Sequence, residues 1–136
     1  MNAFANRAMN QYKQVGTRAK ADVADPHQLI VMLFDGALER IAVAKGAVAR
    51  KNVEERGQKI SSTIAIIDGL IASLDKENGG EVADNLEALY YYMQRRLLIA
   101  NVENSLEPLD EVASLLKDVR SAWVNIPMEQ RMAVNG

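Results

Sequence analysis

The sequence predicts an all-α protein, an antiparallel four-helix bundle, and three observations support this fold class. Apolar residues recur at steps of three and four along most of the chain, without the strict alternation of a β-strand. Strong helix breakers are few, because only three prolines and the pair Gly79-Gly80 interrupt this periodicity. A chain of 136 residues has room for one hydrophobic core. Four amphipathic helices joined by short polar loops would enclose that core.

The first helix is expected from about Pro26 to about Arg50. Asp25 is in the position of an N-cap, Pro26 in the first helical position, and Gln28 in the position of a capping-box glutamine. Two rows are expected to face the core: Phe34, Ile41 and Val48, and Ile30, Ala37 and Ala44. The opposite side is also apolar or small, with Leu29, Met32, Gly36 and Val43.

The second helix follows Asn52, a second candidate N-cap, and is expected to end near Asn78-Gly79. Its inward residues are Ile60, Ile64, Ile67, Ile71 and Leu74. Ser61, Ala65, Gly69 and Ala72, flanked by Ile66, form a predicted outward stripe. Such small residues let another helix approach closely, or they are ordinary surface residues.

The third helix is expected from about Glu81 to about Glu103, and the fourth from about Leu106–Pro108 to about Ile126. The third places Val82, Leu86, Leu89, Met93, Leu97 and Ala100 inward, and Tyr91, Leu98 and Val102 on an outward stripe. The fourth places Leu109, Val112, Leu116, Val119, Trp123 and Ile126 inward. Either a partner helix or another segment of this chain would cover the outward apolar residues.

The two ends differ from the bundle, which we assign to residues 25–126. Residues 1–24 form an N-terminal segment with a weak helical stripe of Phe4, Ala8, Tyr12 and Val15. This segment either docks in a groove of the bundle as a cap or is disordered. Residues 127–136 are expected to form a flexible tail, because they are too few and too polar to pack independently.

Composition excludes several classes of protein. Hydrophobic residues make up 49% and charged residues 25%, which is typical of a soluble globular chain. The net charge of −2 argues against a nucleic-acid partner, and the absence of cysteine excludes disulfides and thiol chemistry. No stretch resembles a membrane span or a signal peptide, so we expect a cytoplasmic protein without membrane insertion.

An enzyme is not expected, nor a cofactor or a metal site. His27 is the single histidine, so the chain lacks the Glu-x-x-His pairs of di-iron bundles, and it also lacks a phosphate-binding glycine loop. We interpret His27 as an ordinary residue at a helix start. The alternative function is histidine phosphotransfer or another regulatory helical bundle, which also uses four helices and one histidine.

Several blocks, in order, resemble the flagellar export chaperone family FliS. They are residues 12–16 and 25–37, residues 64–70 and 74–86, residues 89–101, and the pair Ala122-Trp123. The extreme N-terminus departs from the family, whose members often begin Met-Tyr, because this chain begins Met1-Asn2-Ala3-Phe4. A role carried by an aromatic residue at the second position would fall here to Phe4 or Tyr12.

The resemblance implies a cytosolic binding protein. Its client would be the disordered C-terminal segment of flagellin, which it would keep from polymerising and deliver to the flagellar type III export apparatus. A membrane component of the export gate would be a second partner. We assign client binding to Tyr12, Val15, Ile66, Gly69, Leu70, Tyr90, Tyr91, Leu98 and Val102.

Overall fold

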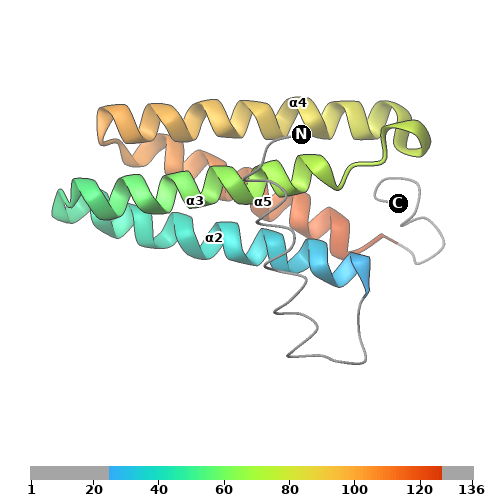
Figure 1. The fold of residues 1–136 in the computed structure, drawn as a ribbon, viewed down its shortest axis with the longest axis horizontal. Helices are drawn as coiled ribbons and strands as arrows, with labels where there is room; N and C mark the ends of the chain where they lie inside the picture. The colour runs from blue at the N-terminus through green and yellow to red at the C-terminus, as the bar shows by residue number, and fades with distance from the viewer. Residues whose placement is uncertain (1–24, 127–136) are drawn as a thin grey trace.

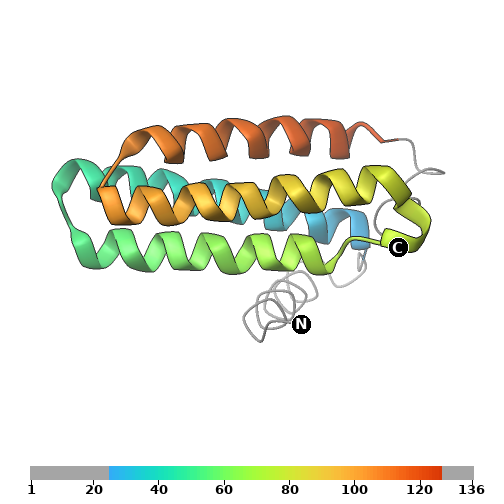
Figure 2. The same cartoon turned by 90° about the horizontal axis from the view of Figure 1, so that it is seen from above.

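The computed structural model describes residues 25–126, which form four helices. They are α2 (Pro26–Arg50), α3 (Val53–Ala72), α4 (Lys76–Glu103) and α5 (Leu106–Val124). Successive helices run in opposite directions, and each packs against the next, with α5 returning to α2 (Figures 1 and 2). The connections are only two or three residues long, which forces each helix to turn back along its predecessor. The predicted all-α four-helix bundle is confirmed.

The N-caps of the first two described helices form as predicted. The Asp25 side chain accepts a hydrogen bond from the backbone N–H of His27 at 2.9 Å, and the Asn52 side chain accepts one from Glu55 at 3.1 Å. Gln28 does not complete a capping box, because its carboxamide oxygen is buried without a hydrogen-bond partner among residues 25–126. The carboxylate of Asp25 therefore acts as the cap without the reciprocal bond.

The boundary between α3 and α4 differs from the expected one. Helix α3 ends at Ala72, not near Asn78, and α4 begins directly after Asp75. The Asp75 carboxylate accepts hydrogen bonds from the backbone and side-chain nitrogens of Asn78, so Asp75 starts a new helix where the apolar pattern suggested a continuing one. Gly80 then kinks α4 with φ 52° and ψ −127°, a backbone conformation that only glycine adopts readily.

The core lies along the axis of the bundle and contains the residues predicted from periodicity in α2, α4 and α5. Its largest fully buried side chains are Phe34, Leu33, Ile41, Ile60, Ile67, Leu70, Met93, Leu97, Leu109, Leu116 and Val112. Val82 is the exception, since it was expected inward and is 54% exposed. Val82 follows the Gly80 kink by two residues, where α4 meets its neighbours less closely.

A buried arginine joins α3 to the C-terminal end of α4. Arg56 donates from Nε to Asn101 Oδ1 at 3.0 Å and from a terminal nitrogen to Asn104 Oδ1 at 2.6 Å. The carbonyl end of a helix favours a positive charge, which helps to compensate for the burial of this guanidinium. None of the four described helices is long and apolar enough to cross a membrane.

Candidate functional site

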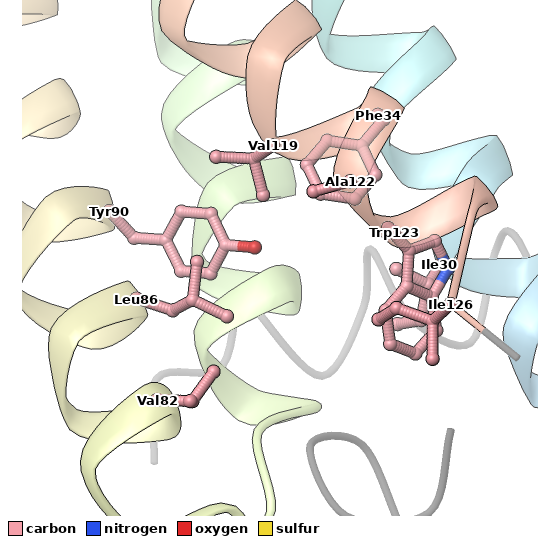
Figure 3. A pocket seen from close by; sticks show the side chains of 9 residues that line it. All are labelled: Ile30, Phe34, Val82, Leu86, Tyr90, Val119, Ala122, Trp123 and Ile126. Carbon is pink, nitrogen blue, oxygen red and sulfur yellow. The ribbon is translucent and has the colours of Figure 1, made fainter. Parts of the chain in front are cut away.

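An apolar groove opens between α4 and α5 at the end of the bundle where α2 begins. We call it the α4–α5 groove (Figure 3). It has a volume of about 150 Å³, and its walls come from α2, α4 and α5 together with Ile126 just beyond α5. The lining residues are Ile30, Phe34, Val82, Leu86, Tyr90, Val119, Ala122, Trp123 and Ile126. Since these residues are apolar or aromatic, the groove suits an apolar ligand or side chain.

Trp123 is held in the wall of this groove by His27. The imidazole stacks on the indole with ring centroids 4.6 Å apart and an interplanar angle of 19°. The indole N–H donates to the carbonyl of His27 at 3.1 Å, and His27 Nε2 lies 3.0 Å from the carbonyl oxygen of Trp123. These contacts join the first turn of α2 to the last turn of α5, so they fix one wall of the groove.

Tyr90 contributes an aromatic ring from α4. Figure 3 shows the phenol extending from α4 toward the side chains of α5. Only 3% of Tyr90 is exposed, and this burial raises the pKa of its hydroxyl well above the usual value of 10. The hydroxyl therefore stays protonated at neutral pH, and the groove carries no charge from this residue.

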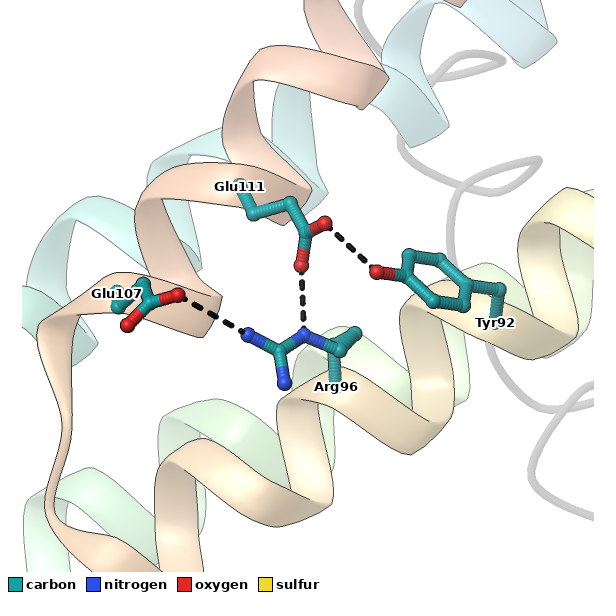
Figure 4. A network of polar contacts seen from close by, with 4 residues as sticks. All are labelled: Tyr92, Arg96, Glu107 and Glu111. Carbon is teal, nitrogen blue, oxygen red and sulfur yellow. Dashed lines mark hydrogen bonds and ion pairs between the residues drawn. The ribbon is translucent and has the colours of Figure 1, made fainter.

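The other half of the contact between α4 and α5 is polar and closed (Figure 4). Glu111 on α5 accepts two hydrogen bonds from α4, one from Arg96 Nε at 2.6 Å and one from the Tyr92 hydroxyl at 2.7 Å. Arg96 also lies 3.8 Å from a carboxylate oxygen of Glu107. Each carboxylate oxygen of Glu111 thus has its own donor on α4, which holds the two helices together here.

This polar network shifts the pKa values of its members in opposite directions. The hydrogen bonds from Tyr92 and Arg96 lower the pKa of the Glu111 carboxyl, because they favour its charged form. The bond to Glu111 raises the pKa of Tyr92, and it raises the pKa of Arg96 as well. At neutral pH the network is therefore a carboxylate held by one cation and one neutral phenol.

A second apolar surface lies on the outer side of α4. Tyr91, Leu98 and Val102 are 46%, 55% and 84% exposed, as the predicted outward stripe requires. Their spacings of seven and four residues place them on one face of the helix. Leu86 and Tyr90 lie on a different side of α4, so the helix presents apolar side chains both to the groove and to the outside.

Four other predicted client-binding residues are buried. Tyr90 lines the α4–α5 groove, Ile66 and Leu70 belong to the hydrophobic core, and Gly69 is buried. The outward position expected for Ile66 and Gly69 is therefore wrong, although Ser61 of the same stripe is exposed. The remaining two, Tyr12 and Val15, are outside the described residues 25–126.

Helical geometry separates Gly69 from Ser61. A step of four residues turns a helix by about 400°, so a stripe built from such steps rotates by roughly 80° between Ser61 and Gly69. Ser62, seven residues before Gly69 and on the same face, accepts a hydrogen bond from Arg40 of α2 at 2.7 Å. Gly69 therefore shares a face of α3 with a residue that contacts α2, and it is buried.

Sequence reasoning missed the groove because it assigned most of its lining residues to a closed core. Periodicity shows which side of a helix is apolar, but not whether two apolar sides touch along their whole length. One sequence feature pointed to the gap: the pair Gly79-Gly80 lies shortly before Val82, and Gly80 is where α4 kinks. A helix that bends beside an apolar row leaves part of that row without a neighbour.

His27 has a more specific role than an ordinary helix-start residue. Its ring is partly buried against Trp123, and Nε2 already lies at hydrogen-bonding distance from a carbonyl oxygen. Within residues 25–126, no group of three or more histidine, aspartate or glutamate side chains is arranged to hold a metal ion.

Comparison with known proteins shows the family to which this chain belongs. The family model described as "Flagellar protein FliS" matches residues 8–130. Flagellar secretion chaperone FliSB of Pseudomonas aeruginosa is 48% identical over 123 residues, which cover 90% of this chain and 98% of that protein. The flagellar secretion chaperone FliS of Salmonella typhimurium is 46% identical, and the match covers 90% of this chain and 92% of that protein. The FliS of Vibrio cholerae is 34% identical, and the match covers 90% of each chain. The chain therefore belongs to the FliS family of flagellar secretion chaperones.

Proposed function

We propose that this protein binds the disordered C-terminal segment of flagellin and keeps it from polymerising before export. The observation that carries the proposal is the open α4–α5 groove, an apolar surface without a partner among residues 25–126. The exposed stripe of Tyr91, Leu98 and Val102 adds a second contact surface on α4. The names of the relatives, flagellar secretion chaperones, support an export client.

The two surfaces favour a client that is disordered when free. They lie on different sides of α4, so one client must pass around the helix to cover both. An extended chain can do this and can form short helices where it meets apolar residues. The cost of ordering the chain offsets part of the binding energy, so the complex stays releasable while the apolar surface of the client is hidden.

Delivery to the export apparatus completes the proposed function. The encounter takes place in the cytosol, and the loaded chaperone then presents the client to the flagellar type III export machinery, with a membrane component of the export gate as second partner. Neither nucleotide hydrolysis nor a cofactor enters this cycle, since binding and release need only the apolar surfaces described above.

Calorimetry with a flagellin C-terminal peptide tests the proposal. We expect a one-to-one complex with a negative heat-capacity change from apolar burial, and no binding of a flagellin that lacks this segment. Equal binding of the intact and the truncated flagellin would contradict the proposal.

Two matched valine variants test whether the groove carries the binding. Val82 lines the groove and is 54% exposed, whereas Val53 is 64% exposed at the first position of α3 and does not line the groove. We expect Val82→Ser to weaken the client complex by about tenfold, the loss of part of one buried valine, and Val53→Ser to leave it unchanged. Equal affinities of the two variants would place the client elsewhere.

A further inference from the structure

The α4–α5 groove opens where the described part of the chain ends. Ile126, the last described residue, forms part of the groove wall next to Trp123. Ten residues follow, 127–136, and a chain of this length spans up to about 33 Å when extended. The segment that begins at Pro127 therefore starts at the groove and is long enough to cross it from α5 to α4.

The composition of this segment suits the groove. Met128 and Met132 are four residues apart, so they share one face of a helical turn, and Pro127 is suited to the first position of such a turn. Methionine fills irregular apolar spaces and makes favourable contacts with aromatic rings. The groove presents the rings of Phe34, Tyr90 and Trp123, and an apolar cavity of about 150 Å³ accepts a benzene-sized group.

Charge adds a second reason. Between the two methionines, Arg131 is next to Met132, and Glu129 is next to Met128 at the other end. The start of α4, which forms the far rim of the groove, carries exposed Glu81 and Asp84 on either side of Val82 and Ala83. A tail that places Met132 against α4 brings Arg131 close to this acidic rim.

We propose that residues 127–136 fold back over the α4–α5 groove, with Met128 beside Trp123 and Met132 beside Val82 and Leu86. The groove supplies an apolar surface for the two methionines. Because the tail is covalently attached to the groove, its effective concentration there is on the order of millimolar, so a few contacts suffice. If the client also uses the groove, as the proposed function holds, tail and client compete for it.

Trp123 makes this proposal measurable, because it is the single tryptophan of the chain and it lines the groove. We expect truncation after Ile126, and the double substitution Met128→Gln with Met132→Gln, to increase acrylamide quenching of Trp123 fluorescence. Gln130→Ala, a substitution in the same tail away from the two methionines, is the matched control and should leave quenching unchanged. Far-UV circular dichroism verifies that each variant keeps its helices.

Methionine methyl NMR tests the same contact directly in the intact protein. We expect the methyl resonances of Met128 and Met132, identified by their loss in the substituted variants, to be displaced from the random-coil position by the neighbouring aromatic rings. Random-coil positions for both methyls, together with unchanged quenching after truncation, would overturn the proposal. If the double substitution lowers helix content, the methyl shifts of the unmodified chain decide alone.

Other occupants of the groove give different results. Exposure of Trp123 by deletion of residues 1–24, but not by deletion of residues 127–136, would assign the groove to the N-terminal segment and overturn the proposal. Quenching that depends on protein concentration would assign it to a second copy of the chain. All these measurements use the free protein, so their results do not depend on whether a flagellin peptide binds. A docked tail together with a failure to bind the peptide would refute only the proposed function.

Discussion

The two halves of the contact between α4 and α5 differ in chemistry and in closure. Near the connection between these helices, Tyr92 and Arg96 of α4 meet the carboxylate of Glu111 at 2.7 and 2.6 Å. Toward the other end, the same helices face each other with apolar residues and leave a groove of about 150 Å³. One pair of helices is thus held by directional polar contacts at one end and open at the other.

This difference shows how a small bundle can keep an apolar surface available without losing its fold. The polar half sets the spacing of α4 and α5, and the stack of His27 on Trp123 attaches the far end of α5 to α2. Helix α5 is thus fixed both at Glu111 and at Trp123. The groove lies between these two points, so its shape does not depend on contacts among the groove residues themselves.

Removing the indole should cause the largest loss of stability. Trp123→Ala deletes a side chain that is 5% exposed and that joins α5 to α2, so we expect the free energy of unfolding to fall by about 3–5 kcal/mol. Urea denaturation measures this change. Val124→Ala, at the exposed neighbour on α5, should stay within about 0.5 kcal/mol of the unmodified protein. Similar losses in both variants would mean that Trp123 does not anchor α5.

Loss of the imidazole should have an intermediate effect. His27→Ala removes the ring stacked on Trp123 and the contact of Nε2 with a backbone carbonyl. We expect a loss of about 1–2 kcal/mol in the free energy of unfolding, from one aromatic pair and one hydrogen bond. His27→Phe keeps an aromatic partner and should recover part of this loss. A His27→Ala variant as stable as the unmodified protein would show that the end of α5 is fixed by other contacts.

High pH should weaken the open half through Tyr90. Burial raises the pKa of Tyr90 in the folded state above its unfolded value of about 10, so the folded protein keeps this proton longer. Stability is therefore complete below about pH 10 and falls as pH rises further, by at most about 1.4 kcal/mol per pH unit for one group. Urea midpoints at about pH 9 and about pH 11 should show this decline, and Tyr90→Phe should reduce it. Tyr91→Phe, at an exposed tyrosine, is the control, and an equal decline in all three proteins would exclude Tyr90 as its source.

Low pH should weaken the polar half through Glu111, with the smallest effect. Its hydrogen bonds from Tyr92 and Arg96 lower the pKa of Glu111 below the usual 4.5, so the stabilisation is present above that value and is lost as pH falls through the lowered pKa. The difference in melting temperature between the unmodified protein and Glu111→Gln should therefore shrink from about pH 7 to about pH 3. Glu103→Gln, at an exposed carboxylate at the end of α4, should show no such trend. A constant difference for Glu111→Gln would indicate that its charge does not hold the two helices.

Most of the fold follows from local rules that act within a few residues. Asp25 and Asn52 were recognised as N-caps because a short polar acceptor precedes each apolar periodic segment, and both side chains accept the expected backbone bonds. The boundary after α3 was misplaced because Leu74 continues the apolar spacing of Ile67 and Ile71. The Asp75 carboxylate instead accepts a hydrogen bond from the backbone N–H of Asn78 and starts a new helix there. Periodicity alone does not decide whether the helix continues or a new one starts.

The candidate site was predictable only in part. Tyr91, Leu98 and Val102 were identified because a helix that is apolar on two sides must expose one of them, and all three are exposed. The groove depends on how far apart two helices lie, which a one-dimensional pattern does not contain. Ile66 was misplaced for a related reason, since the position of the neighbouring helices decides which side of α3 is covered.

In acid, the contact between α4 and α5 should be lost before the contact between α3 and α4, because amide side chains hold Arg56 in the latter. Arg56 joins α3 to the end of α4 through Asn101 and Asn104, and neither arginine nor asparagine changes its charge in mild acid. The polar contact between α4 and α5 depends instead on the carboxylate of Glu111, which acid neutralises. An acid-unfolding pathway of this protein should therefore begin with α5 leaving α4, while α3 and α4 remain paired.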